Sequence, residues 1–169
     1  MTPTKMKRNW SVATMTLSHK DKWIVLIRWL TIVSSIILFI VSLLLPALLF
    51  QEVEPVTGAN LLVWGWWGLI LGNPAWCANP LFLIALVVFS FKKYVFALIA
   101  GVVAFILGAC SFFASEYYFN EGSSTPIAGL GLAFYVWMLS FGVFIAGSLL
   151  LFIISRGAAI SSDHSEQFI

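Results

Sequence analysis

The stretch FKKYVFALIAGVVAFILGACSFFAS, residues 91–115, joins a basic pair to a long segment that carries no charge. A helix needs about 20 predominantly apolar residues to cross the ~30 Å hydrocarbon core of a bilayer, and in lipid its backbone must satisfy its own hydrogen bonds. Residues 94–115 meet both conditions and are predicted to form a transmembrane helix. The preceding apolar stretch ends at Phe91, so the connection through Lys92 and Lys93 is short and the two helices are expected to be antiparallel neighbours.

Small residues recur on one face of this predicted helix. Their spacing alternates between four and three residues, which places all of them on a single stripe. Because lipid gives helices no hydrophobic drive to associate, close packing depends on small side chains that let two backbones approach. The stripe is interpreted as a helix-packing seam rather than a ligand groove, and the last predicted helix is its expected partner. The seam consists of Ala97, Gly101, Ala104, Gly108, Ser111 and Ser115.

Composition extends this reading to the whole chain. Hydrophobic residues make up 61% and charged residues 9% of the sequence, against roughly 45–50% and about 25% in soluble domains. The expected fold is therefore an all-α integral membrane protein built as a four-transmembrane-helix bundle. The predicted spans are residues 23–50, 79–91, 94–115 and 126–155. They lie between a basic cytoplasmic or interfacial tail, residues 1–22, and a disordered cytoplasmic tail, residues 156–169.

The charges are divided between the connections. Every Lys and Arg lies before or just inside the first span, in the turn at Lys92 and Lys93, or at Arg156 after the fourth span. The first and third connections contain no Lys or Arg and carry Glu52, Glu54, Glu116 and Glu121. By the positive-inside rule, both termini are predicted to be cytoplasmic and these two connections external.

The first connection contains a stretch rich in tryptophan and interrupted by two Asn-Pro pairs. Its apolar residues 59–71 are too few to cross a bilayer and too apolar for an exposed loop, which favours an interfacial or re-entrant segment over the second span. Asn-Pro begins helices well, and it occurs at Pro74 and again at Pro80. A start at Pro74 leaves an interior proline, whereas a start at Pro80 leaves a short span. We expect the second helix to start at Asn79-Pro80 beneath an external cap formed by Trp64, Trp66, Trp67, Trp76, Asn79 and Pro80.

The sequence offers little catalytic chemistry. The last three predicted spans contain no Asp, Glu, Lys, Arg or His between their ends, although proton and ion coupling usually require such groups within the membrane. No motif for a metal, a cofactor, a phosphate group or nucleic acid is present. Cys77 and Cys110 both fall toward the external side, where free thiols are favoured and a disulfide is the alternative. We expect a non-enzymatic protein without a cofactor.

Two segments carry a resemblance. Trp76-Cys77-Ala78-Asn79-Pro80, followed by an apolar run, and the Gly-rich segment from Gly129 to Trp137 resemble small uncharacterised four-helix bacterial inner-membrane proteins with a Trp-x-Ala-Asn-Pro segment. The resemblance covers the last three helices and implies the fold and a bacterial inner-membrane location, without an active residue. The expected function is an accessory or modulatory subunit of an envelope complex or stress response, with lipid and another membrane protein or a second copy as partners. A small channel or transporter, homo-oligomeric in one form, is the alternative.

Overall fold

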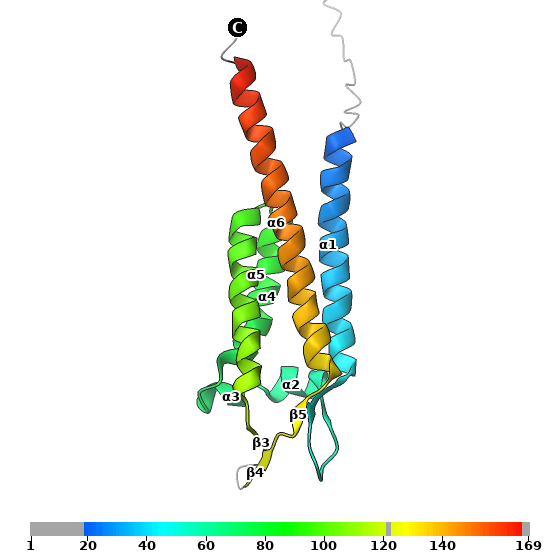
Figure 1. Ribbon diagram of the computed structural model, residues 1–169, viewed down its shortest axis with the longest axis vertical. Helices are drawn as coiled ribbons and strands as arrows, with labels where there is room; N and C mark the ends of the chain where they lie inside the picture. Colours follow the sequence, from blue (N-terminus) through cyan, green and yellow to red (C-terminus); the bar gives the residue numbers. More distant parts are fainter. Residues whose placement is uncertain (1–18, 121–122, 167–169) are drawn as a thin grey trace, which may run out of the picture.

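The computed structural model describes residues 19–120 and 123–166 and is mostly helical (Figure 1). Three helical segments, Asp21–Leu44, Tyr94–Phe113 and Leu132–Gly157, are long and apolar enough to cross a membrane among the described residues, as in a multi-pass membrane protein. The helices are α1 (His19–Leu44), α2 (Gly58–Trp64), α3 (Trp67–Ile70), α4 (Ala78–Ser90), α5 (Tyr94–Ala109) and α6 (Leu132–Glu166), with the 3₁₀ turns η1 (Pro74–Cys77) and η2 (Cys110–Phe113). The strands are β1 (Pro46–Leu49), β2 (Val56–Thr57), β3 (Glu116–Asn120), β4 (Ser123–Pro126) and β5 (Gly129–Leu130).

Short strands at one end of the molecule replace the last residues of the first predicted span and the first residues of the last predicted span. The first span was expected to be helical to residue 50, but α1 ends at Leu44 because Pro46 disfavours helical backbone at the residue before it. β1 then pairs antiparallel with β2 and with β5, so residues 126–131 are also not helical. Gly131 N–H donates to Ala47 O at 2.8 Å, just before α6 begins. The expectation of an all-α fold is therefore wrong at this end.

The second predicted helix uses both Asn-Pro pairs. Asn73 Oδ1 accepts from Ala75 N–H at 3.0 Å and caps η1, which begins at Pro74. α4 follows from Ala78, one residue before the predicted start, so Pro80 lies in its first turn, where the backbone needs no N–H donor. The two starts that the sequence presents as alternatives thus follow each other. At 13 residues, α4 alone is about 20 Å long.

The third predicted helix ends earlier than expected. α5 stops at Ala109, η2 continues to Phe113, and Glu116 opens β3 instead of following a helix that reaches residue 115. β3 and β4 form an antiparallel hairpin, and Ile127 N–H extends the pairing by donating to Ser115 O at 2.9 Å. Ser115 therefore belongs to the hairpin.

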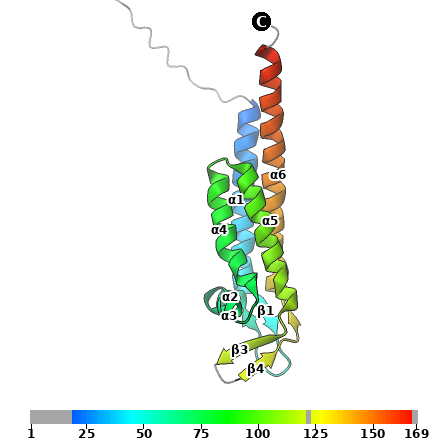
Figure 2. The same ribbon diagram turned by 90° about the vertical axis from the view of Figure 1, so that its left-hand side faces the viewer.

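The chain ends depart from the expected tails. The predicted basic tail lies outside the described residues up to residue 18, and α1 begins at His19. The C-terminal residues 156–169 were expected to be disordered, but α6 continues to Glu166 because no proline interrupts it. Both α1 and α6 extend beyond the turn that joins α4 to α5, on the same side of the molecule as that turn (Figures 1 and 2).

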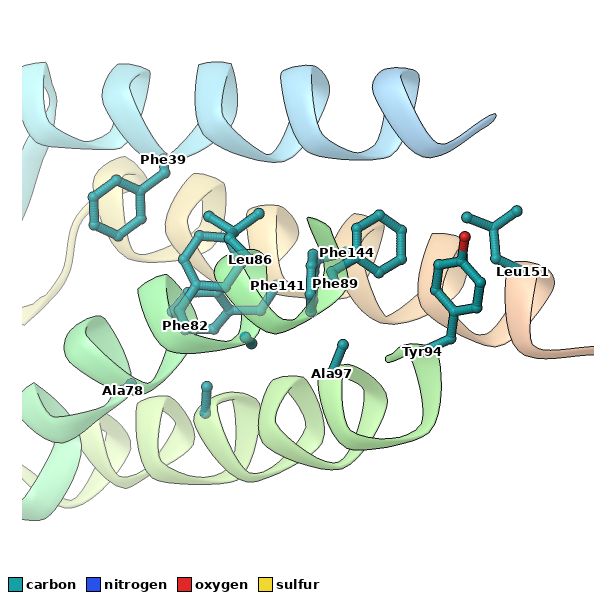
Figure 3. Close-up of a cluster of buried hydrophobic side chains, with 12 residues drawn as sticks. Phe39, Ala78, Phe82, Leu86, Phe89, Tyr94, Ala97, Phe141, Phe144 and Leu151 are labelled. Atoms are coloured by element: carbon teal, nitrogen blue, oxygen red, sulfur yellow. The ribbon is translucent and has the colours of Figure 1, made fainter. Parts of the chain in front are cut away.

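The core lies where α1, α4, α5 and α6 meet (Figure 3). Phe82 of α4 is fully buried between Phe39 of α1 and the α6 rings of Phe141 and Phe144, with ring centroids 5.6, 4.6 and 5.6 Å away. The ring of Phe89, about two turns further along α4, has its centroid 5.3 Å from that of Phe144. α6 packs most extensively against α1 and also contacts α5, and α4 packs against α5. Aromatic side chains from three helices thus fix the mutual positions of the helices.

Candidate functional site

Only some residues of the predicted seam are buried on α5. Ala97, Gly101, Ala104 and Gly108 are buried. A side chain built at Gly101 would place its Cβ 3.0 Å from Phe144 of α6, and one built at Gly108 would place it 2.9 Å from Met138 Sδ. The buried glycines thus lie against α6. Ser111 is half-buried in η2, and Ser115 is exposed at the base of the β3–β4 hairpin.

A second row of small and polar residues packs α1 against α6. Gly147 of α6 lies so close to Thr31 of α1 that a Cβ at Gly147 would overlap the Thr31 side chain. Ser35 of α1 and Ser148 of α6 are fully buried, and within the described part of the chain their hydroxyls have no hydrogen-bond partner. Sequence reasoning proposed the α5–α6 pair as the leading contact and did not assign Thr31. The spacing of Thr31, Ser35 and Ser42 by four and then seven residues, which places them on one helix face, was the available signal.

The Asn-Pro pair of α4 is the centre of a hydrogen-bonded network. Trp137 Nε1–H, on α6, donates to Asn79 Oδ1 at 3.0 Å. Asn79 Nδ2–H donates to Trp76 O at 3.3 Å, which is the carbonyl that a residue other than proline at position 80 would reach from its backbone N–H. Trp76 Nε1–H in turn donates to Leu62 O of α2 at 2.9 Å. The network connects α2, η1, α4 and α6 and satisfies the polar groups that Pro80 leaves unpaired.

The tryptophans of the predicted cap are placed in two ways. Three of them are exposed: Trp64 ends α2, Trp67 begins α3, and Trp66 lies in the turn between these helices. The rings of Trp66 and Trp67 stack with centroids 4.8 Å apart. Trp76 is half-buried and hydrogen-bonded within the network. α2 and α3 lie at the end of the molecule where α4 begins (Figure 1). Trp137 is a further member of this region that sequence reasoning used only in the resemblance.

A pocket of about 80 Å³ lies beside the network. Its walls come from the end of α1, β1, α2, the first turn of α4, η2, β5 and the start of α6. Most of the lining side chains are apolar, including Leu43, Leu62 and Ala133, and Asn79 and Trp137 contribute polar atoms at one side. Segments far apart in sequence therefore close around one small apolar space.

Reactive side chains are sparse among the described residues. No group of three or more His, Cys, Asp or Glu there could hold a metal ion. Cys77 and Cys110 are half-buried free thiols in η1 and η2, and Cys110 Sγ lies 3.7 Å from Ile106 O. Outside the spans, burial raises the pKa of Tyr117, whose ring lies 4.9 Å from Phe119 and 6.1 Å from Phe50.

The arrangement offers packing surfaces, a hydrogen-bonded junction and a small apolar pocket. Comparisons with protein-family models, with curated proteins and with solved structures give no match to this chain.

Proposed function

We propose that the chain is a multi-pass protein of a bacterial inner membrane that acts by binding another membrane protein, as an accessory or modulatory subunit of an envelope complex or stress response. In this proposal, η1 and α4 together cross the membrane in addition to the three long helices and form the second of four crossings along the chain. Their combined length is about 27 Å, close to a hydrocarbon core of ~30 Å. Both termini are cytoplasmic, and the strands and the Trp-rich helices α2 and α3 lie at the outer surface.

The charge distribution supports this orientation. Lys92 and Lys93 form the α4–α5 turn, on the side of the molecule to which the start of α1 and the end of α6 also point (Figure 1). Glu116 begins β3 at the opposite end. The exposed rings of Trp64, Trp66 and Trp67 lie at that same end, as expected for aromatic side chains in a headgroup region.

The outward face of α1 is the observation that carries the proposed subunit role. α6 covers the face of α1 that contains Thr31, Ser35 and Ser42, which are all buried. On the opposite face, large aliphatic side chains alternate at three- and four-residue intervals and are 47–77% exposed. This spacing is that of a left-handed helix pair, in which such side chains interlock with a second helix. The row consists of Leu30, Val33, Ile37, Ile40 and Leu44.

Site-specific photocrosslinking in native membranes tests this role. A photoreactive residue in place of Ile37 is expected to give one discrete product that contains a foreign membrane protein in a fixed ratio. The matched control is Ile99 of α5, which is 56% exposed against 54% for Ile37 but lies outside the α1 row. Adducts with lipid alone at both positions, or the same set of proteins at both, would contradict the proposal.

A small channel is the second candidate, and one observation favours it. Ser35 and Ser148 place two buried hydroxyls without a partner, among the described residues, between α1 and α6. Polar side chains in a helix interface can line a route once the helices separate. A pure homo-oligomer that conducts ions in liposomes, and loses conductance in S35A/S148A but not in a variant of the exposed Ser155, would favour the channel over the subunit.

A further inference from the structure

The pocket beside Asn79 and Trp137 has a size that restricts what it can hold. Its volume is about 80 Å³, whereas pockets for drug-sized ligands run from roughly 300 to 1,000 Å³ and an apolar cavity of about 150 Å³ takes up benzene. A nucleotide, a sugar or a peptide side chain with its backbone does not fit. A short segment of a hydrocarbon chain does.

The lining favours an apolar occupant. A trapped water needs about two to four polar partners, but the Ser111 hydroxyl is the one polar side-chain group of this wall whose hydrogen bonds are not already made within the described part of the chain. Asn79 uses its oxygen for Trp137 and its nitrogen for Trp76 O, and Ser42 Oγ–H donates to Phe39 O at 2.6 Å. The remaining surface is largely aliphatic.

The position of the pocket indicates where such an occupant comes from. Ser42 and Leu43 line it, and the apolar segment Asp21–Leu44 of α1 ends one residue beyond them. The pocket therefore lies at the end of a membrane span, at the depth where the acyl chains of a leaflet meet its headgroups. We propose that it is a binding site for the acyl chain of a membrane lipid, held between α1, α2 and the first turn of α6. This inference rests on the proposed membrane insertion but not on the proposed partner.

Lipid photolabelling tests the site because its wall contains buried residues, whereas exposed residues lie next to the wall in the sequence. Ala47 and Leu48 of β1 are 4% and 6% exposed, so lipid at the protein surface does not reach them. Leu132 and Tyr135, at the start of α6, are 59% and 56% exposed and report surface lipid. The full chain is reconstituted in vesicles of phosphatidylethanolamine and phosphatidylglycerol that contain a phosphatidylethanolamine with a diazirine on the part of one acyl chain next to its ester bond, the part that lies at this depth. After irradiation and peptide mapping, label is expected on Ala47 and Leu48 as well as on Leu132 and Tyr135.

Two pocket-filling variants make the test specific. Ala133→Leu adds an isopropyl group to a residue that is 2% exposed in the pocket wall, and Leu62→Phe fills the space from α2. Each is expected to remove the label from Ala47 and Leu48 while leaving it on Leu132 and Tyr135, which also shows that the variant still inserts. The matched control Ala146→Leu, on an exposed position of α6, keeps all of the label.

Absence of label from Ala47 and Leu48 in the unmodified chain, as expected for water or an empty pocket, would overturn the proposal. Retention of that label in both filled variants would do the same. If no protein crosslink forms at Ile37 while the lipid labelling is as expected, the subunit role is refuted and the lipid site is not.

Discussion

Two glycines of α6 allow the same substitution to be made with and without a steric neighbour. A Cβ added at Gly147 would overlap Oγ1 and Cγ2 of Thr31, whereas one added at Gly142 meets nothing within 4 Å. Thr31 cannot move aside easily, because it is β-branched and its hydroxyl donates to Ile27 O at 2.8 Å. Replacement of Gly by Ala gains about 0.8–1.0 kcal/mol of helix propensity at either position. This gain cancels when the two variants are compared.

The difference between Gly147→Ala and Gly142→Ala therefore measures the overlap between α1 and α6. Overpacking of a close-packed interior costs about 1–3 kcal/mol, so Gly147→Ala is expected to be less stable than Gly142→Ala by that amount. The assay is unfolding of detergent-solubilised protein by titration with sodium dodecyl sulfate, followed by helix content. Adding Thr31→Ala to Gly147→Ala should recover part of the loss, because the Thr31 Cβ that remains is still 2.8 Å from the new methyl group. Equal stability of the two single variants would refute the α1–α6 packing described here.

Three further predictions concern the end of the molecule that carries the strands. In a double-mutant cycle, Asn79→Ala and Trp137→Phe should show a coupling free energy of roughly 0.6 kcal/mol, and at most about 1.7 kcal/mol, in the same unfolding assay, the average and the maximum found for hydrogen bonds between membrane helices; purely additive effects would exclude the Nε1–Oδ1 bond. Gly131→Ala should destabilise the protein more than Gly129→Ala, because a Cβ at Gly131 would overlap the backbone of Pro46 and one at Gly129 meets nothing within 4 Å; similar melting temperatures would contradict the β1–β5 junction. Burial raises the pKa of Tyr117, so its neutral form stabilises the folded state below the unfolded pKa of about 10 and this stabilisation is lost as pH rises through the higher folded value; Tyr117→Phe should remove a phenolate component that titrates above about 10 from the ultraviolet titration, and loss of a component at or below that pH would argue against the buried ring.

The sequence predicted those features that depend on neighbouring residues. The length of an apolar run decides whether a helix can cross a bilayer, and the three long helices follow from it. Spacing along one helix also identifies a face, and residues 97, 101, 104 and 108 indeed lie on the buried side of α5. Which helix covers that face is not a local property. The extensive α1–α6 contact joins helices that are separated by 87 residues of chain, from Leu44 to Leu132, and was not anticipated.

The ends of the helices were missed for the same reason. β1 pairs with β2 on one side and, on the other, with β5, about 80 residues later, and an apolar segment such as Pro46–Leu49 does not by itself distinguish a strand from one more helical turn. The prediction that the second helix starts at either Pro74 or Pro80 also assumed that this segment is α-helical throughout. A 3₁₀ turn followed by an α-helix accommodates both prolines, and the side chain of Asn79 bonds the carbonyl that Pro80 leaves free. The bond from Trp137 to Asn79, across 58 positions, needed the folded chain to be seen.

Cysteine accessibility tests the proposed topology most directly. In a background with Cys77 and Cys110 replaced by serine, single cysteines are introduced as Lys93→Cys in the α4–α5 turn and Ser124→Cys in β4, and cells with a permeable outer membrane are treated with a maleimide that does not cross the inner membrane. The account predicts that Ser124→Cys is labelled in intact cells and that Lys93→Cys is labelled only after the inner membrane is opened. Labelling of both positions from the same side would contradict it.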